Sequence, residues 1–354
     1  MKRYRLILIF LSCALFFESC AGTHYSYREP LYEQTVEKGS VLRDFSLEPQ
    51  LEDRILSLDP EQIAEIDIEE VLSHAPAPRI LNIHGGIYPV YLAMVSFSKF
   101  LIRMGYPEAK IRNPEDGSYS YSCYNDSEKL AGIVAWYYEK EGMRPMLIGH
   151  SQGGMQSVKV LHELSGSFRE TISVWNPLTN TREDRDWIID PFTGDARPVV
   201  GIEVSFASAV GAGGLTRLLP NQWRMLSRLR TVPDSVGEFT GFHMGFDIFG
   251  GDFMGFGGSN KYSPNGKAQV RNVQLPAGYS HVFVPFTKHL AESKEIRDWI
   301  NAYTPSETPE LDVTFESSST NILWAADVWH SIKKHWVLEL KRMILAKRNS
   351  HDVR

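Results

Sequence analysis

Short apolar runs alternate with longer helical segments from residue 79 onwards, and this alternation is the feature that most limits how the chain can fold. Most of these runs have five or six residues, which suits a buried strand and is too short for a buried helix. A strand that reaches the next strand through a helix makes a parallel sheet, with helices packed on both faces. The predicted fold class is therefore α/β, with a mostly parallel central sheet.

Capping and turn residues bound the predicted elements. The helix over 126–141, for example, begins at an Asp that can cap its first N–H groups and ends before Gly142. The acidic segment 59–73 is predicted as a helix because Asp59 and Pro60 suit a helix start. The predicted strands are 79–83, 145–149, 171–175, 239–249 and 270–275, and the other predicted helices are 90–104, 154–164, 222–229 and 291–303.

Four regions are predicted along the chain. They are a signal segment over 1–20, a tether and N-terminal extension over 21–78, an α/β domain over 79–303, and a linker with a C-terminal amphipathic helix over 304–354. Within the α/β domain the strand–helix alternation stops around 177–235. Because long structureless connections are uncommon in compact domains, this stretch predicts a cap or lid insertion.

The C-terminal helix carries apolar residues at helical spacing. They are Ile322, Ala325, Trp329, Ile332, Trp336, Leu340 and Met343, with lysines and arginines between them. We expect this face to pack on the α/β core. Docking on a membrane surface or on a partner, helped by the basic residues, is the alternative.

The first 20 residues resemble a bacterial lipoprotein signal. Basic residues precede an apolar run over 6–17, which is too short to span a membrane comfortably. Cys20 is the predicted lipidation site, and Cys13 or ordinary cleavage near Gly22 are the alternatives. The segment predicts export to the bacterial cell envelope as a membrane-anchored lipoprotein, or otherwise as a periplasmic or secreted protein.

Charge and motifs exclude several classes of function. The formal net charge is −6, whereas nucleic-acid binders usually present a basic face to the phosphates. The three cysteines lack the spacing of a zinc site. The glycine clusters at 211–214 and 250–258 match neither a dinucleotide loop nor a phosphate loop. We therefore predict no metal, no cofactor and no nucleic-acid partner.

The strongest local signal is Gly149-His150-Ser151-Gln152-Gly153, which lies between a predicted strand and a predicted helix. A strand that reverses directly into a helix holds the central Ser151 in a strained backbone with its hydroxyl exposed. The flanking glycines are small because the turn brings their Cα atoms close to neighbouring chain. The N–H groups at the helix start then face any negative charge that develops near the serine.

Together with His84-Gly85-Gly86 after an earlier strand and a late histidine, this motif resembles the nucleophile elbow of the α/β-hydrolase superfamily, particularly its lipase and esterase branches. The resemblance covers residues 79–303. It implies a serine hydrolase that cleaves a small-molecule ester or a lipid through an acyl-enzyme, with Ser151 as the nucleophile. An acyltransferase, an amidase or peptidase, and a binding protein without activity are alternatives on the same fold.

A serine nucleophile needs a base within hydrogen-bond reach. His281 is the best candidate because it follows the last predicted strand, where the resembled family carries its histidine. His289 is a rival near the start of the last core helix, and His243 is assigned to a strand. His150 and His84 are expected to bond locally and to hold their loops.

The resemblance places the acid of the triad after the second-last strand. Asp252 fits best, because the pair Gly250 and Gly251 marks the predicted strand end. Asp247 is the next candidate but would lie inside the strand, and Asp234 fits only if that strand is misplaced.

The same family binds the developing oxyanion with two backbone N–H groups. The resemblance assigns them to Gln152 and Gly86, with Ile87 as the alternative if the loop is one residue longer. The implied reaction is acyl transfer, in which Ser151 attacks an ester carbonyl and His281 passes the proton to the leaving alcohol.

Overall fold

The protein is described by a computed structural model over residues 41–214, 216–218, 220–250 and 260–352. Several predictions fall outside these ranges. They are the signal segment over 1–20, lipidation at Cys20 or Cys13, the part of the tether over 21–40 and the triad acid at Asp252.

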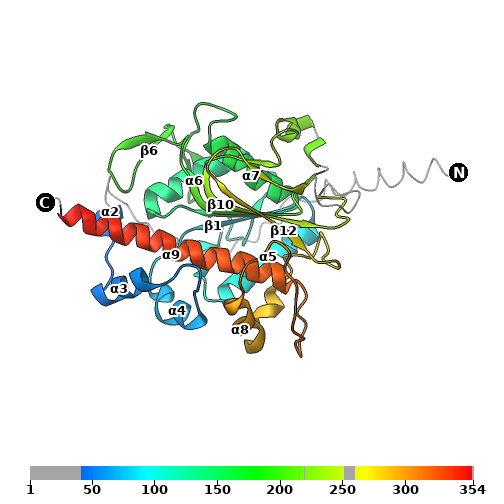
Figure 1. Cartoon of the computed structure of the whole chain (residues 1–354). Helices are drawn as coiled ribbons and strands as arrows, with labels where there is room; N and C mark the ends of the chain where they lie inside the picture. Colours follow the sequence, from blue (N-terminus) through cyan, green and yellow to red (C-terminus); the bar gives the residue numbers. More distant parts are fainter. Residues whose placement is uncertain (1–40, 215, 219, 251–259, 353–354) are drawn as a thin grey trace.

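Six parallel strands form the central sheet, in the order β12-β10-β8-β3-β1-β2 (Figure 1). They are β1 Ile80–His84, β2 Tyr121–Ser122, β3 Met146–His150, β8 Val204–Val210, β10 Val236–Met244 and β12 Gln269–Leu275. The predicted α/β class with a parallel sheet is confirmed. Because the strands are parallel, the loops that follow β1, β3, β8, β10 and β12 all leave the same edge of the sheet.

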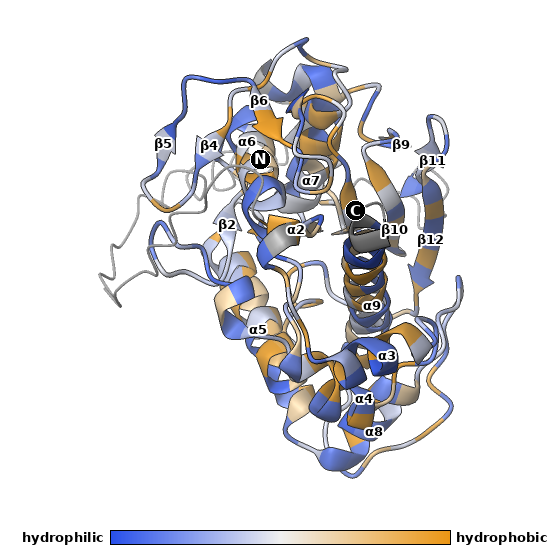
Figure 2. Ribbon diagram, turned by 90° about the vertical axis from the view of Figure 1, so that its left-hand side faces the viewer, coloured by the Kyte–Doolittle hydropathy of each residue, from blue (hydrophilic) through white to orange (hydrophobic). Residues whose placement is uncertain are grey.

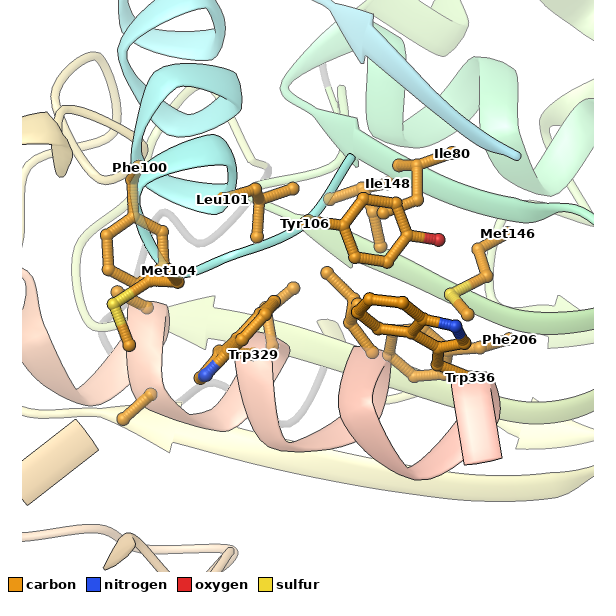
Figure 3. Packing of buried hydrophobic residues seen from close by; sticks show 14 of the residues in the cluster. Ile80, Phe100, Leu101, Met104, Tyr106, Met146, Ile148, Phe206, Trp329 and Trp336 are labelled. Carbon is orange, nitrogen blue, oxygen red and sulfur yellow. The ribbon is translucent and has the colours of Figure 1, made fainter. Parts of the chain in front are cut away.

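Helices cover both faces of the sheet and enclose two apolar cores. The helices α6 Ser127–Glu141 and α7 Gln152–Leu164 pack on one face, and α5 Tyr88–Arg103 and α9 Ile322–Asp352 pack on the other. Alternate strand residues point to opposite faces, so Ile148 joins the core beneath α5 and α9 while Leu147 joins the other. Figure 3 shows Trp336 of α9 beside Phe206 and Met146 of the sheet.

The remaining elements are short, and the longest of them, α3 and α8, have nine residues each. They are α2 Val41–Asp44, α3 Pro49–Ser57, α4 Glu65–Glu70, α8 Lys294–Ala302, β4 Trp175–Asn176, β5 Thr181–Arg182, β6 Trp187–Ile189, β7 Ala196–Pro198, β9 Thr231–Val232, β11 Ser263–Pro264, and 3₁₀ helices over Leu72–His74, Glu108–Lys110, Thr216–Leu218, Pro220–Met225 and Lys288–Ala291.

The strand β8 lies inside the range 177–235 that we predicted as an insertion, and it pairs with β3 and β10 in the middle of the sheet. Its sequence, Val-Ser-Phe-Ala-Ser-Ala-Val, has few large apolar residues, although all seven residues are buried. Small residues suit this position because α7 crosses β8 closely: a Cβ added to Gly154 would lie 3.3 Å from the Cβ of Ala209. The strand–helix alternation therefore resumes earlier than predicted.

Three other predicted elements are wrong. The segment 171–175 is not a strand of the sheet, because only Trp175–Asn176 is extended and it pairs antiparallel with β5. The segment 222–229 is not an α-helix but partly a 3₁₀ helix. The helix predicted over 59–73 is shortened to α4 and the 3₁₀ helix over Leu72–His74, because the Asp59 side chain accepts the N–H of Glu61 in a turn and no helix begins there.

Helix α9 is buried on nearly all sides over 322–344, rather than along one face. The predicted apolar positions are buried, but so are Asp327, Lys333 and Glu339. These polar side chains have partners, which are Arg271 for Asp327, the carbonyls of Ile63 and Asn301 for Lys333, and Arg144 for Glu339. A buried charge is tolerated only when it is paired and hydrogen-bonded in this way.

The helices α3, α4 and α8 lie against the side of α9 that faces away from the sheet (Figures 1 and 2), whereas α2 contacts both α9 and α6. Lys341 of α9, for example, donates to the carbonyls of Leu56 and Leu58 at the end of α3. This cover explains why hydrophobic and hydrophilic residues are mixed around α9 (Figure 2). Within the described ranges, no helix combines the length and apolarity that crossing a bilayer requires.

Candidate active site

The backbone of Ser151 is strained at the junction of β3 and α7. Its φ of 56° and ψ of −127° lie outside the regions that residues with a side chain ordinarily occupy. The end of β8 and the loop after it hold this conformation. The Ser151 N–H donates to the Val210 carbonyl at 2.9 Å, and the Gly213 N–H donates to the Ser151 carbonyl at 3.0 Å. Strain that the surroundings hold in place is common at functional sites.

Glycines flank Ser151 because no side chain fits beside it. A Cβ on Gly149 would collide with the carbonyl oxygen of Gly153 and with the Ser157 hydroxyl, and a Cβ on Gly153 would collide with the carbonyl of Ile83. The steric reason that the sequence suggested for both glycines is confirmed.

The imidazole of His281 lies at hydrogen-bond distance from Ser151. Its Nε2 is 2.9 Å from the Ser151 Oγ, so the hydroxyl can donate to the ring. The residue lies in the turn after β12, and its side chain is only 10% exposed. The two rival histidines lie on other elements, His243 within β10 and His289 within the 3₁₀ helix that precedes α8.

The ring of His150 packs beside His281 and bonds to its backbone. The Nε2–H of His150 donates to the His281 carbonyl at 2.5 Å, and the two ring centroids are 5.4 Å apart. Burial, helped by the neighbouring His281, lowers the pKa of His150 to about 3, so its ring is neutral at neutral pH. His150 therefore ties the loop of His281 to the strand that carries Ser151.

The carboxylate that contacts His281 belongs to Asp247. Its Oδ1 and Oδ2 lie 2.8 Å and 2.9 Å from the His281 Nδ1, and its side chain is 3% exposed. A buried carboxylate at this distance orients the imidazole and favours the tautomer with its proton on Nδ1. The structure thus joins Asp247, His281 and Ser151 in one line of contacts.

The sequence ranks Asp247 second as the acid, because the predicted strand over 239–249 would contain it. The strand β10 in fact ends at Met244, and Phe246 adopts a φ of 60°, so the chain has turned before it reaches Asp247. The favoured Asp252 lies outside the described residues. The third candidate, Asp234, bonds elsewhere and accepts backbone N–H groups of the 267–268 segment.

The loop after β1 passes directly over the Ser151 hydroxyl. A Cβ added to Gly85 would lie 2.7 Å from the Ser151 Cβ and 3.0 Å from its Oγ, and one added to Gly86 would lie 2.8 Å from the Gln152 Oε1. The two residues predicted to bind an oxyanion, Gly86 and Gln152, therefore lie together beside Ser151. His84 holds this loop as expected, because its Nδ1 bonds to the Gly85 carbonyl at 2.7 Å.

Two aromatic residues, Tyr124 and Phe249, also contact the site. The Tyr124 hydroxyl donates to the Gly86 carbonyl at 3.0 Å. The Phe249 ring lies 5.4 Å from the His281 ring, measured between centroids. Neither residue belongs to a motif, and each reaches the site from a loop at the same edge of the sheet.

No group of three or more His, Cys, Asp and Glu side chains is arranged to hold a metal ion within the part of the chain that the structure describes. Comparison of the chain with models of protein families, with curated proteins and with solved structures found no match.

Proposed function

We propose that this protein is a serine hydrolase of the α/β-hydrolase type that cleaves carboxylic esters, with Ser151 as the nucleophile, His281 as the base and Asp247 as the acid. The observation that carries the proposal is the line of contacts from the Asp247 carboxylate through both ring nitrogens of His281 to the Ser151 hydroxyl. These separations are within normal hydrogen-bond range, so a proton can move between the serine and the ring.

The two ring nitrogens of His281 have different tasks in this mechanism. The Nδ1–H donates to Asp247, which leaves Nε2 free to accept the Ser151 proton as Oγ bonds to the ester carbonyl carbon. The imidazolium then gives that proton to the leaving alkoxide oxygen as its bond to the carbonyl carbon breaks. In the second half, Nε2 takes a proton from water as the water oxygen bonds to the acyl carbon. The imidazolium then returns that proton to the Ser151 Oγ as its bond to the acyl carbon breaks, which releases the acid and restores the free serine.

The backbone N–H groups of Gln152 and Gly86 are the proposed donors to the oxyanion. Gln152 is the first residue of α7, where the N–H groups lack helical partners and the helix dipole favours negative charge. The close approach of the Gly85–Gly86 loop to Ser151 supports the second donor.

Exposed apolar side chains surround this edge of the sheet and favour an ester with an apolar group. They are Tyr88, Tyr124, Phe246, Ile248, Phe249 and Phe283. Each lies within a few residues of, or in contact with, a residue of the site. Exposed apolar residues that gather in this way mark binding surfaces, which is consistent with an esterase or lipase.

Labelling with a fluorophosphonate tests the proposal. We expect the wild-type protein to react once, at Ser151, with the adduct located by mass spectrometry of the peptide. Ser151→Ala should not label. The matched control is Ser157→Ala, which removes a serine of the same helix and should keep the Ser151 adduct. A folded protein that never labels would instead favour a binding protein, and faster turnover of nitroanilides than of nitrophenyl esters would favour an amidase.

The exposed Phe283 provides a prediction about substrate preference. Phe283→Ser should lower kcat/KM for a nitrophenyl octanoate by about tenfold, because about 1–2 kcal/mol of apolar contact with the chain is lost. The acetate ester, which is too short to reach the side chain, should change by less than about twofold. The matched control is Leu345→Ser, which removes an equally exposed side chain from α9. Equal losses on both esters would show that Phe283 does not contact the acyl chain.

A further inference from the structure

Asp247 lies in a turn rather than on a strand or helix, so its position depends on what holds that turn. The Gly250 N–H donates to the Asp247 Oδ1 at 2.8 Å. A side chain at Gly250 would collide with the same carboxylate, so the turn closes tightly around it. The backbone at Gly250 therefore determines where the carboxylate lies relative to His281.

The guanidinium of Arg230 holds Gly250 from the other side. Its Nη2 donates to the Gly250 carbonyl at 3.0 Å, to the Ala212 carbonyl at 3.3 Å and to the Asn260 Oδ1 at 2.7 Å. Its Nη1 donates to the Tyr262 hydroxyl at 2.6 Å. A planar guanidinium can serve several acceptors in fixed directions, which a lysine ammonium cannot do.

The contact with Ala212 connects Arg230 to the other two residues of the site. On one side of Ala212, a Cβ added to Gly211 would lie 2.8 Å from the His281 Nδ1. On the other side, the Gly213 N–H donates to the Ser151 carbonyl. One side chain thus joins the turn that carries the acid to the loop that contacts the base and the serine.

Tyr262, whose hydroxyl accepts from Nη1 of Arg230, is itself held in place. The Tyr262 ring is buried and lies 4.8 Å from the guanidinium carbon, and it packs directly over Gly241 in β10. The guanidinium is therefore fixed relative to β10, the strand that leads to Asp247. Its Nη2, which donates to the Gly250 carbonyl, fixes the turn relative to the same strand.

We propose that Arg230 is a positioning residue for the triad: by binding the Gly250 and Ala212 carbonyls it holds the Asp247 carboxylate in line with His281. The effect of Arg230 on the rate is expected only if the proposed function is correct. Its effect on the Asp247–His281 contact is independent of the proposed function, because that contact can be measured without turnover.

The test compares Arg230→Met, which keeps much of the volume but removes every donor, with Arg230→Lys, which keeps one charge and loses the fork. We expect Arg230→Met to lower kcat on a soluble nitrophenyl ester by about 10- to 100-fold, because a small misplacement of a reacting group has effects of that size. Arg230→Lys should recover part of the loss. KM should change little, since the side chain does not contact the substrate.

The NMR resonances of the His281 ring separate positioning from a general loss of structure. The Nδ1 proton of this ring lies in the hydrogen bond to the Asp247 carboxylate, with 2.9 Å between Nδ1 and Oδ2. A weaker contact should move the resonance of that proton upfield in Arg230→Met, whether or not the protein turns over an ester, while the signals of buried residues elsewhere stay in place.

A double-mutant cycle with Asp247→Asn completes the test. If Arg230 acts through the carboxylate, Arg230→Met should have much less effect on kcat, and none on the His281 ring resonances, once the carboxylate is gone. The same fold-loss in both backgrounds, or unchanged His281 ring resonances in Arg230→Met, would overturn the proposal. A wild-type protein that does not label at Ser151 would contradict the proposed function alone, because the NMR comparison still reports on Arg230.

Discussion

Asp247→Asn is expected to lower kcat by about 10³- to 10⁴-fold on a soluble ester while the protein stays folded. An asparagine can present its amide N–H to the ring, which favours the tautomer with the proton on Nε2 of His281. That tautomer cannot accept the Ser151 proton, and the imidazolium also loses its carboxylate partner. The measurement is steady-state kinetics, with the rate of fluorophosphonate labelling as an independent check.

The matched control is Asp252→Asn, the same change at the residue that the sequence favoured. We expect its kcat to stay within about twofold of wild type, as is usual for a carboxylate outside the reacting groups. Because the two variants differ from wild type by the same atoms, their comparison identifies the acid directly. A large loss in Asp252→Asn with a small one in Asp247→Asn would show that Asp247 is not the triad acid.

The sequence predicted the surroundings of Ser151 because they follow from local chain geometry. A strand that turns at once into a helix forces the strained φ of Ser151 and requires Gly149 and Gly153, and all three features lie within five residues. His281 could be found because it follows the last strand of the sheet. In both cases the residues that allow the prediction lie in one short segment and in the strand or helix next to it.

The carboxylate that contacts His281 was harder to predict, because its position depends on where β10 ends. Apolar residues continue past Met244 through Phe246 to Phe249, so the pattern resembles a longer strand. These side chains are exposed at the edge of the sheet instead of buried within it. Apolar residues of a binding surface and of a core look alike in sequence, and the prediction therefore placed the turn too late.

Long-range pairing explains the other differences between prediction and structure. The sequence cannot show that the charges on α9 are buried, because their partners lie far away along the chain: Asp327 pairs with Arg271, and Glu339 pairs with Arg144. Likewise β8 has a weak pattern of its own and is buried because α7 crosses it. The N-terminal helices form where they can pack on α9, and this long-range packing overrides the local capping signal at Asp59.

The burial of α9 leads to the largest predicted effect on stability. Trp336→Ala should lower the free energy of unfolding by about 3–5 kcal/mol, because a large fully buried ring is removed and the cavity cannot close completely. The Trp336 ring packs against Tyr106 with centroids 4.9 Å apart, and its Nε1–H donates to the Pro76 carbonyl at 2.8 Å (Figure 3). Urea unfolding followed by circular dichroism measures the change.

Two further variants show which part of the Trp336 side chain matters and whether the helix stays docked. Trp336→Phe keeps an aromatic ring but leaves the Pro76 carbonyl without its donor, which should cost about 1–3 kcal/mol. Leu345→Ala, on the exposed side of the same helix, should change the free energy by less than about 0.5 kcal/mol. If all three variants unfolded alike, α9 would not be packed on the sheet in solution, and its apolar residues would be available to a membrane or a partner instead.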